Sequence, residues 1–185
     1  MIKDILSDAE HRMRAALQVL HDDLAAVRTG RAIPALVEKL PVEYYGSPTP
    51  LQQLASISVP EPRTLMIKPF DASTLKTIEK AIQVSDLGLN PNNDGKVIHL
   101  NLPPLTEERR RDLVKHVHHR LEEARIAVRN IRRDAHNDMR DFEKEKLISE
   151  DDLERGEVDL QKLTDRFVEE VGEQGRKKEA EIMEV

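Results

Sequence analysis

The chain has 185 residues, a net charge of −6, a charged fraction of 35% and neither cysteine nor tryptophan. The lack of cysteine excludes disulfides and thiolate chemistry. Aromatic residues make up only 3% of the chain, so no base-stacking platform is evident. No apolar run approaches the roughly 20 residues that span a bilayer, and the first residues lack a signal-peptide pattern, so we expect a soluble, cytoplasmic protein without a membrane partner.

A long amphipathic helix is predicted at the start of the chain. Apolar residues recur every three or four positions from Ile2 to Val27, which is typical of one buried helix face. Arg28 falls in the expected last turn, where a cation suits the helix dipole. Gly30 is then placed to end the helix.

The next segment changes from a helical period to a strand-like one. Residues 42–45, 54–59, 64–68 and 97–102 alternate or run apolar between Gly, Pro and Asn, which predicts short strands. One amphipathic helix is expected over residues 74–84, and residues 90–95 form a cluster of turn formers. The segment is therefore predicted to be a small α/β domain with a sheet and one helix.

Two further long helices follow Pro103 and Pro104. Thr106 is the expected N-cap of the first, and no Gly or Pro interrupts its apolar stripe from Val114 to Phe142. Ser149 is the expected cap of the second, on whose inner face Gly156 would allow close backbone approach. Helices of such length need partner helices for stability.

These elements predict an α+β fold with an elongated antiparallel three-helix bundle. The bundle comprises residues 1–29 and 105–185, and the small domain, residues 30–104, is inserted between the first and second helices. The two connections between the domains meet at one elbow, so we expect an L-shaped protein with a hinge at residues 29–31 and 103–105. The hinge residues are Gly30, Pro103 and Pro104.

The net charge conceals a polarised distribution. Residues 109–133 carry nine Lys or Arg and three Asp or Glu, a net charge of +6, whereas residues 141–185 carry eight and sixteen, a net charge of −8. A local basic stretch on an acidic chain indicates a directed electrostatic contact.

Basic residues on the second long helix form a stripe beside its apolar face. They recur at intervals of four, three, four and four: Arg125, Arg129, Arg132, His136 and Arg140. Arg133 lies further round, on the outer surface. Because the planar guanidinium donates two parallel hydrogen bonds to phosphate, the stripe indicates nucleic-acid contact. The alternative is a solvated face with salt bridges along the helix, although few acids precede these arginines.

A second basic patch is expected where the two connections meet. Arg109, Arg110 and Arg111 begin the second long helix, and Arg28 and Arg31 flank the first connection. Simple solubility explains this cluster equally well.

No constellation of residues supports an enzyme. His116, His119 and Glu123 share a helix face, but they lack a fourth ligand and their surroundings are positive, which disfavours a metal. The paired carboxylates on the helices diverge by about 100° and cannot work as an acid–base dyad. We expect no catalytic residues, no metal and no cofactor.

Six motifs together resemble one known family, the bacterial ribosome recycling factors. The motifs lie in the family's order and at its chain length: Arg28–Ala32, Val42–Gly46, Glu79–Ile82, Ser85–Asn92, Pro103–Arg110 and Val128–Arg133. The resemblance implies a non-enzymatic, monomeric translation factor. Such a factor binds the large ribosomal subunit after termination and, with elongation factor G and GTP, releases ribosomes from messenger RNA.

The resemblance also implies where the partners bind. The bundle would lie on ribosomal RNA, while the small domain would face elongation factor G. The residues expected to bind ribosomal RNA are Arg125, Arg129, Arg132, Arg133, Arg28, Arg31, Arg109 and Arg110. The competing hypothesis is a cytoplasmic coiled-coil adaptor with no RNA role.

Overall fold

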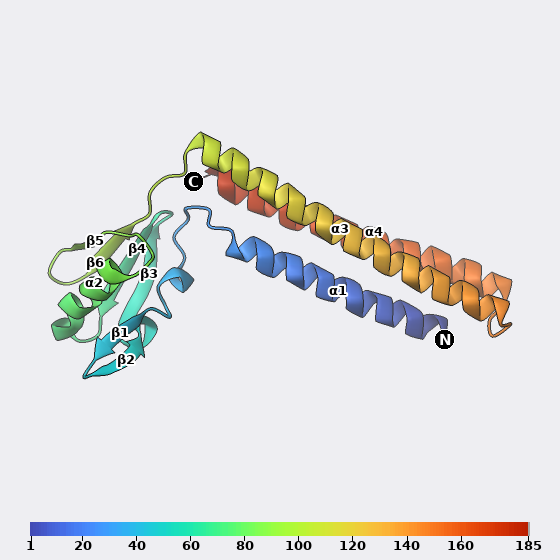
Figure 1. The fold of residues 1–185 in the computed structure, drawn as a ribbon, viewed down its shortest axis with the longest axis horizontal. Coiled ribbons are helices and arrows are strands. Elements are labelled where there is room, and N and C mark those ends of the chain that lie inside the picture. The colour runs from blue at the N-terminus through green and yellow to red at the C-terminus, as the bar shows by residue number, and fades with distance from the viewer. Residues whose placement is uncertain (185) are drawn as a thin grey trace. The chain divides into compact units, whose positions relative to one another are not determined.

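A computed structural model describes residues 1–184. Their contacts form two compact units, residues 1–28 with 107–184 and residues 29–106. The first unit is helical and the second contains all the strands (Figure 1), which confirms the predicted α+β class with a long bundle and a separate sheet. Among residues 1–184, no helix is both long and apolar enough to cross a membrane.

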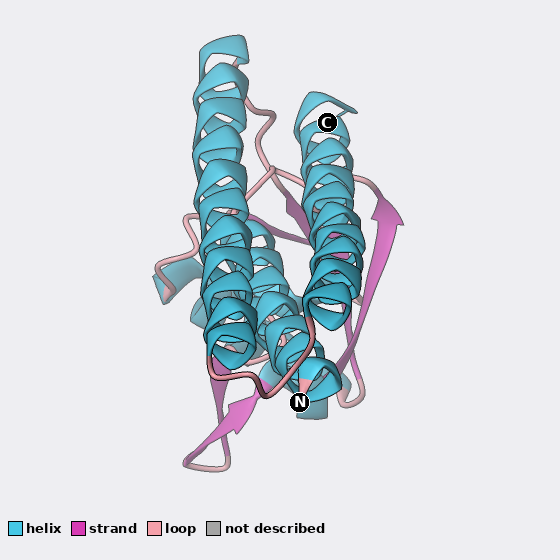
Figure 2. Ribbon diagram, turned by 90° about the vertical axis from the view of Figure 1, so that its right-hand side faces the viewer, coloured by secondary structure: helices cyan, strands magenta, loops and turns pink. Residues whose placement is uncertain are grey.

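Three helices run side by side in the first unit (Figures 1 and 2). They are α1 (Ile2–Ala26), α3 (Glu107–Lys144) and α4 (Glu150–Glu184). α3 has 38 residues, about 57 Å at 1.5 Å per residue. It contacts both other helices along the bundle.

The ends of these helices follow from local capping. α1 ends at Ala26, so Arg28 lies beyond it and not in its last turn as predicted. The apolar pattern misled because Val27 is buried although its backbone is extended. At the start of α4, the Ser149 hydroxyl accepts a hydrogen bond from the Asp152 amide at 3.1 Å, which confirms the predicted cap.

The reversal between α3 and α4 is a Schellman motif built without glycine. Lys146 has a positive φ of 58°. Its amide donates to the Glu143 carbonyl at 2.9 Å, and the Leu147 amide donates to the Phe142 carbonyl at 2.9 Å. The motif turns the chain so that α4 runs back along α3.

The bundle core follows the predicted stripes, with differences on both α3 and α4. α3 buries Leu113 in place of Val114, and α4 buries Thr164, whose hydroxyl donates to the Leu160 carbonyl at 2.8 Å. Gly156 lies in the core as expected, since a Cβ there would come within 3.0 Å of the Met139 sulfur. The remaining central core residues are Ala9, Met13, Val128, Ile131, Ala135, Met139, Leu160 and Phe167.

The second unit holds a four-stranded antiparallel sheet, a two-stranded hairpin and one helix. The larger sheet has the order β3-β4-β6-β5, from β3 (Ala55–Glu61), β4 (Thr64–Pro69), β6 (Ile98–Asn101) and β5 (Pro91–Asn93). α2 (Leu75–Val84) buries Leu75, Ile78 and Ile82 in the same core.

Two strands of this unit were not predicted. β2 (Ser47–Pro50) pairs with β1 (Pro41–Tyr44) across a two-residue turn in which Tyr45 and Gly46 both have positive φ. β5 lies inside the segment predicted to be turn only, and it pairs with β6 at the edge of the sheet. Prolines in both segments argued against strands, because proline lacks the amide hydrogen that a strand donates. Both strands lie at an edge, where the missing donor is tolerated.

Candidate functional site

The predicted basic stripe is exposed on α3 along its boundary with α4. We call Arg125, Arg129, Arg132, Arg133, His136 and Arg140 the arginine face. All are exposed or partly exposed. The buried residues Val128 and Ile131 lie between them in sequence and anchor this part of α3 in the core. The register of α3 therefore holds these side chains at the surface.

A carboxylate is embedded in this face. Glu122 Oε1 lies 2.5 Å from Nη2 of Arg129, and its Oε2 lies 3.6 Å from Nη1 of Arg125. The expectation that few acids could pair with the stripe is therefore wrong for two of its arginines. Arg129 reaches back seven residues along its own helix, a separation outside the usual i,i+3 and i,i+4 pattern.

Contacts across the helix boundary hold two further members of the face. Arg132 Nη1 donates to the Gln161 side-chain oxygen at 3.0 Å, and His136 Nε2 lies 2.9 Å from Glu157 Oε1. Both partners are on α4, and nothing in the sequence alone identified them. Within residues 1–184, Arg133 and Arg140 have no hydrogen-bond or ion-pair partner, so their charges are available to a ligand.

The basic residues at the other end of α3 have mixed surroundings. Arg28 and Arg109 line a hollow of about 520 Å³ in the bundle, together with Arg120, His116, Asp23 and Asp112. Asp23 and Asp112 add two negative charges to this lining, and Asp23 pairs with Arg120 at 4.0 Å.

The three other predicted members of that patch are placed differently. Arg111 pairs with Glu107, one turn before it on α3, at 2.5 Å. Arg110 donates to the Met183 carbonyl at 3.1 Å, a contact that ties the start of α3 to the end of α4. Arg31 is exposed and belongs to the second unit. The structure therefore does not gather all the predicted basic residues within the bundle.

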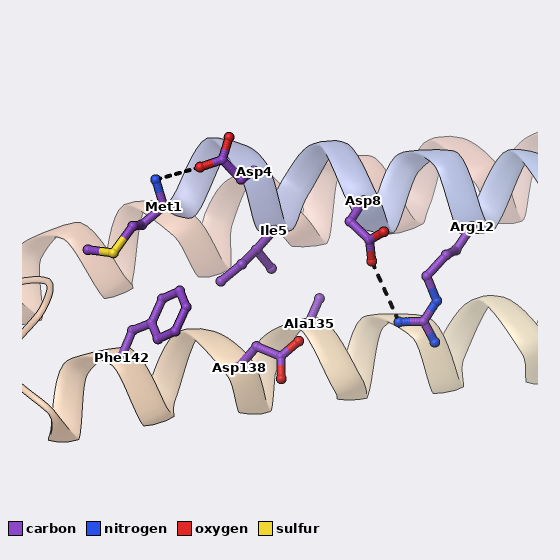
Figure 3. Close-up of a pocket in the computed structure, with 8 residues that line it drawn as sticks. All are labelled: Met1, Asp4, Ile5, Asp8, Arg12, Ala135, Asp138 and Phe142. Atoms are coloured by element: carbon purple, nitrogen blue, oxygen red, sulfur yellow. Dashed lines mark ion pairs between the residues drawn. The ribbon is translucent and has the colours of Figure 1, made fainter.

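A smaller hollow lies between the start of α1 and the end of α3 (Figure 3). It has a volume of about 270 Å³, and its polar lining includes Asp4, Asp8 and Asp138. The amino terminus pairs with Asp4 at 2.8 Å, and Arg12 pairs with Asp8 at 3.9 Å, as the dashed lines show. This acidic lining is unsuited to a nucleic-acid phosphate.

Two members of the group considered as metal ligands, His119 and Glu123, pair with each other. His119 lies 3.3 Å from Glu123, whose second oxygen accepts a hydrogen bond from Arg120 at 2.9 Å. That hydrogen bond lowers the pKa of Glu123. No group of three or more possible metal ligands occurs in the part of the chain that the structure describes.

Comparison with known proteins assigns the family. The family model for ribosome recycling factor matches residues 3–183. The chain belongs to the ribosome recycling factor family. It is 58% identical to the ribosome-recycling factor of Chloroflexus aurantiacus over 185 residues, which cover the whole of both chains.

Two solved structures of ribosome recycling factors match this fold. A solution structure is 46% identical, covers 100% of this chain and 98% of its own, and has a TM-score of 0.73. The second is the T. thermophilus ribosome recycling factor, described with E. coli elongation factor G bound to the E. coli post-termination complex. It is 48% identical, with a TM-score of 0.63 and 98% coverage of each chain.

Proposed function

We propose that the protein recycles ribosomes. It binds the large ribosomal subunit after termination and, with elongation factor G and GTP, splits the post-termination complex and releases the messenger RNA. The observation that carries this proposal is the match to ribosome recycling factors along the whole chain. A relative at 48% identity is described with elongation factor G on a post-termination complex, which favours this function over a coiled-coil adaptor.

The arginine face is the proposed contact with ribosomal RNA. Arg133 and Arg140 present charges without partners among residues 1–184, and Arg132 is held only by a neutral amide. Whether it is unpartnered or held only by an amide, such a guanidinium can donate two hydrogen bonds to a phosphate. Arg125 and Arg129 belong to the same contact, and Arg28, Arg31, Arg109 and Arg110 extend it.

The protein acts without catalysing a reaction itself. The partner GTPase hydrolyses GTP, and the recycling factor binds the ribosome and orients the partner. It works in the cytoplasm as a monomer and without a cofactor. Gly30, Pro103 and Pro104 form a hinge at residues 29–31 and 103–105, between the bundle and the inserted domain. The bundle binds RNA, while elongation factor G contacts the inserted domain, residues 30–104, and exerts force on it.

A splitting assay tests the proposal directly. Post-termination ribosomes are mixed with the purified protein, elongation factor G and GTP, and subunit separation is followed by light scattering. We expect splitting only when all components are present. Absence of splitting in the complete mixture, with elongation factor G active in GTP hydrolysis, would contradict the function.

A further inference from the structure

One carboxylate accepts a hydrogen bond from Arg129 and forms an ion pair with Arg125, two arginines that RNA would need. Glu122 contacts Arg129 at 2.5 Å and Arg125 at 3.6 Å. Arg129 lies back along α3, and its Nε donates to the Arg125 carbonyl at 3.3 Å. Carboxylate and phosphate compete for the same planar guanidinium fork.

No other member of the arginine face pairs with a carboxylate of α3 among residues 1–184. Arg132 contacts the neutral Gln161, and His136 contacts Glu157 on α4. Arg133 and Arg140 have no partner among residues 1–184. The face therefore has an available part, a part that Glu122 neutralises, and His136, which contacts a carboxylate of α4.

We propose that Glu122 is a built-in competitor for RNA phosphate. It occupies Arg125 and Arg129 in the free protein and is displaced when they bind RNA. It thereby limits the affinity of the factor and speeds its release from the large subunit. This inference rests on the RNA-binding function proposed for the arginine face.

The competition acts on dissociation because of its time scale and its charge. Glu122 and Arg129 are about half exposed, and exposed side chains exchange rotamers within nanoseconds, so displacement does not slow association. After displacement, the carboxylate stays beside a bound phosphate, and the repulsion between them destabilises the complex. A factor that must leave after each round gains from such a residue.

The adjacent glutamate supplies a matched control. Glu123 is 48% exposed and Glu122 51%, and a Gln substitution at either removes the same charge. Glu123, however, pairs with Arg120 and His119, outside the arginine face. Any gain in association rate from the lower negative charge is therefore shared by both variants.

The test measures binding of Glu122→Gln and Glu123→Gln to isolated large subunits, with association and dissociation rates. An exposed ion pair of ordinary strength predicts binding about two- to fivefold tighter for Glu122→Gln than for Glu123→Gln. The difference should lie in slower dissociation. It should shrink when both are combined with Arg129→Ala, which removes the main partner.

Other outcomes overturn the inference in distinguishable ways. Equal affinities of the two glutamine variants would show that Glu122 does not compete. Weaker binding by Glu122→Gln would show that the carboxylate positions the arginines instead. If Arg129→Ala and Arg133→Ala both bind as tightly as the parent protein, the RNA-binding function of the face fails, and the inference fails with it.

Discussion

Gly175 of α4 lies directly against Leu121 of α3. A Cβ on Gly175 would overlap Cδ1 of Leu121 and come within 3.1 Å of its Cδ2, and Leu121 is buried. Gly172, one turn earlier, has open space apart from the Arg176 guanidinium at 3.4 Å. The two glycines therefore differ in their surroundings. Close packing of α4 against α3 requires a glycine at position 175, whereas no core contact requires one at position 172.

Alanine substitutions should separate the two glycines. Gly172→Ala should raise the free energy of unfolding by up to about 1 kcal/mol, because alanine favours a helix. Gly175→Ala should lower it, since an overpacked core site costs roughly 1–3 kcal/mol. Urea denaturation measures both, and a stabilising Gly175→Ala would show that the helices can move apart without penalty.

Removing Arg132 should weaken RNA binding without unfolding the protein. Its contact with Gln161 is at the surface, so Arg132→Ala should change stability by less than about 0.5 kcal/mol. A lost contact to phosphate is worth roughly 1.5–3 kcal/mol, which predicts large-subunit binding about tenfold or more weaker. Arg155→Ala, at an exposed position of α4, is the control. Unchanged affinity with a lowered melting temperature would make Arg132 structural.

Charge reversal should be worse than charge removal on the same face. Replacing both Arg129 and Arg133 with Glu adds repulsion from RNA to the contacts that a double Ala variant loses. The gap between the variants should narrow as salt is raised. Ribosome pelleting at two salt concentrations measures it, and equal binding of the two variants would count against an RNA partner.

Periodicity predicted the bundle because each long helix repeats its pattern over many turns. The stripe from Val117 to Met139 repeats often enough to fix which side of α3 is buried. The arginine face follows from the same periodicity. Its exposure was predictable because charged residues beside a buried stripe remain in water.

The contacts that modify the face were not predictable from spacing. The pair of Glu122 with Arg129 depends on a side chain lying along its helix for seven positions. The contact of Arg132 with Gln161 depends on the rotation of α4 against α3. The strand β5 depends on pairing with β6, which is a non-local interaction. Each requires the folded structure and not only a local pattern.

Acid should abolish one contact between α1 and α4. Glu10 accepts hydrogen bonds from Arg14 at 2.9 Å and Arg166 at 2.7 Å. Arg14 first and then Arg166 lower its pKa below the ordinary value of 4.5. A lowered pKa means that the carboxylate stabilises the fold above its unfolded pKa and loses that effect as the pH falls through the folded pKa.

Glu10→Gln should therefore lower the melting temperature at pH 7 but not in strong acid. The difference from the parent protein should shrink progressively as the pH is reduced below about 4.5. Glu173→Gln, an exposed glutamate of α4 with no partner among residues 1–184, is the control. A difference that persists unchanged at pH 2.5 would show that packing, and not charge, explains the effect of Glu10.

The hinge should separate binding from splitting. Gly30 has a φ of 77°, a conformation that valine disfavours strongly, so Gly30→Val should strain the first connection. Changing Pro103 and Pro104 to glycine should loosen the second. Neither position lies in the three helices, so both variants should bind large subunits as tightly as the parent protein. Both should split ribosomes more slowly with elongation factor G. The inserted domain would pass the force from elongation factor G to the bundle in the wrong direction, or a looser connection would absorb part of that force. Binding is measured by pelleting and splitting by light scattering. Parental splitting rates in both variants would show that the two connections do not act as a hinge in recycling.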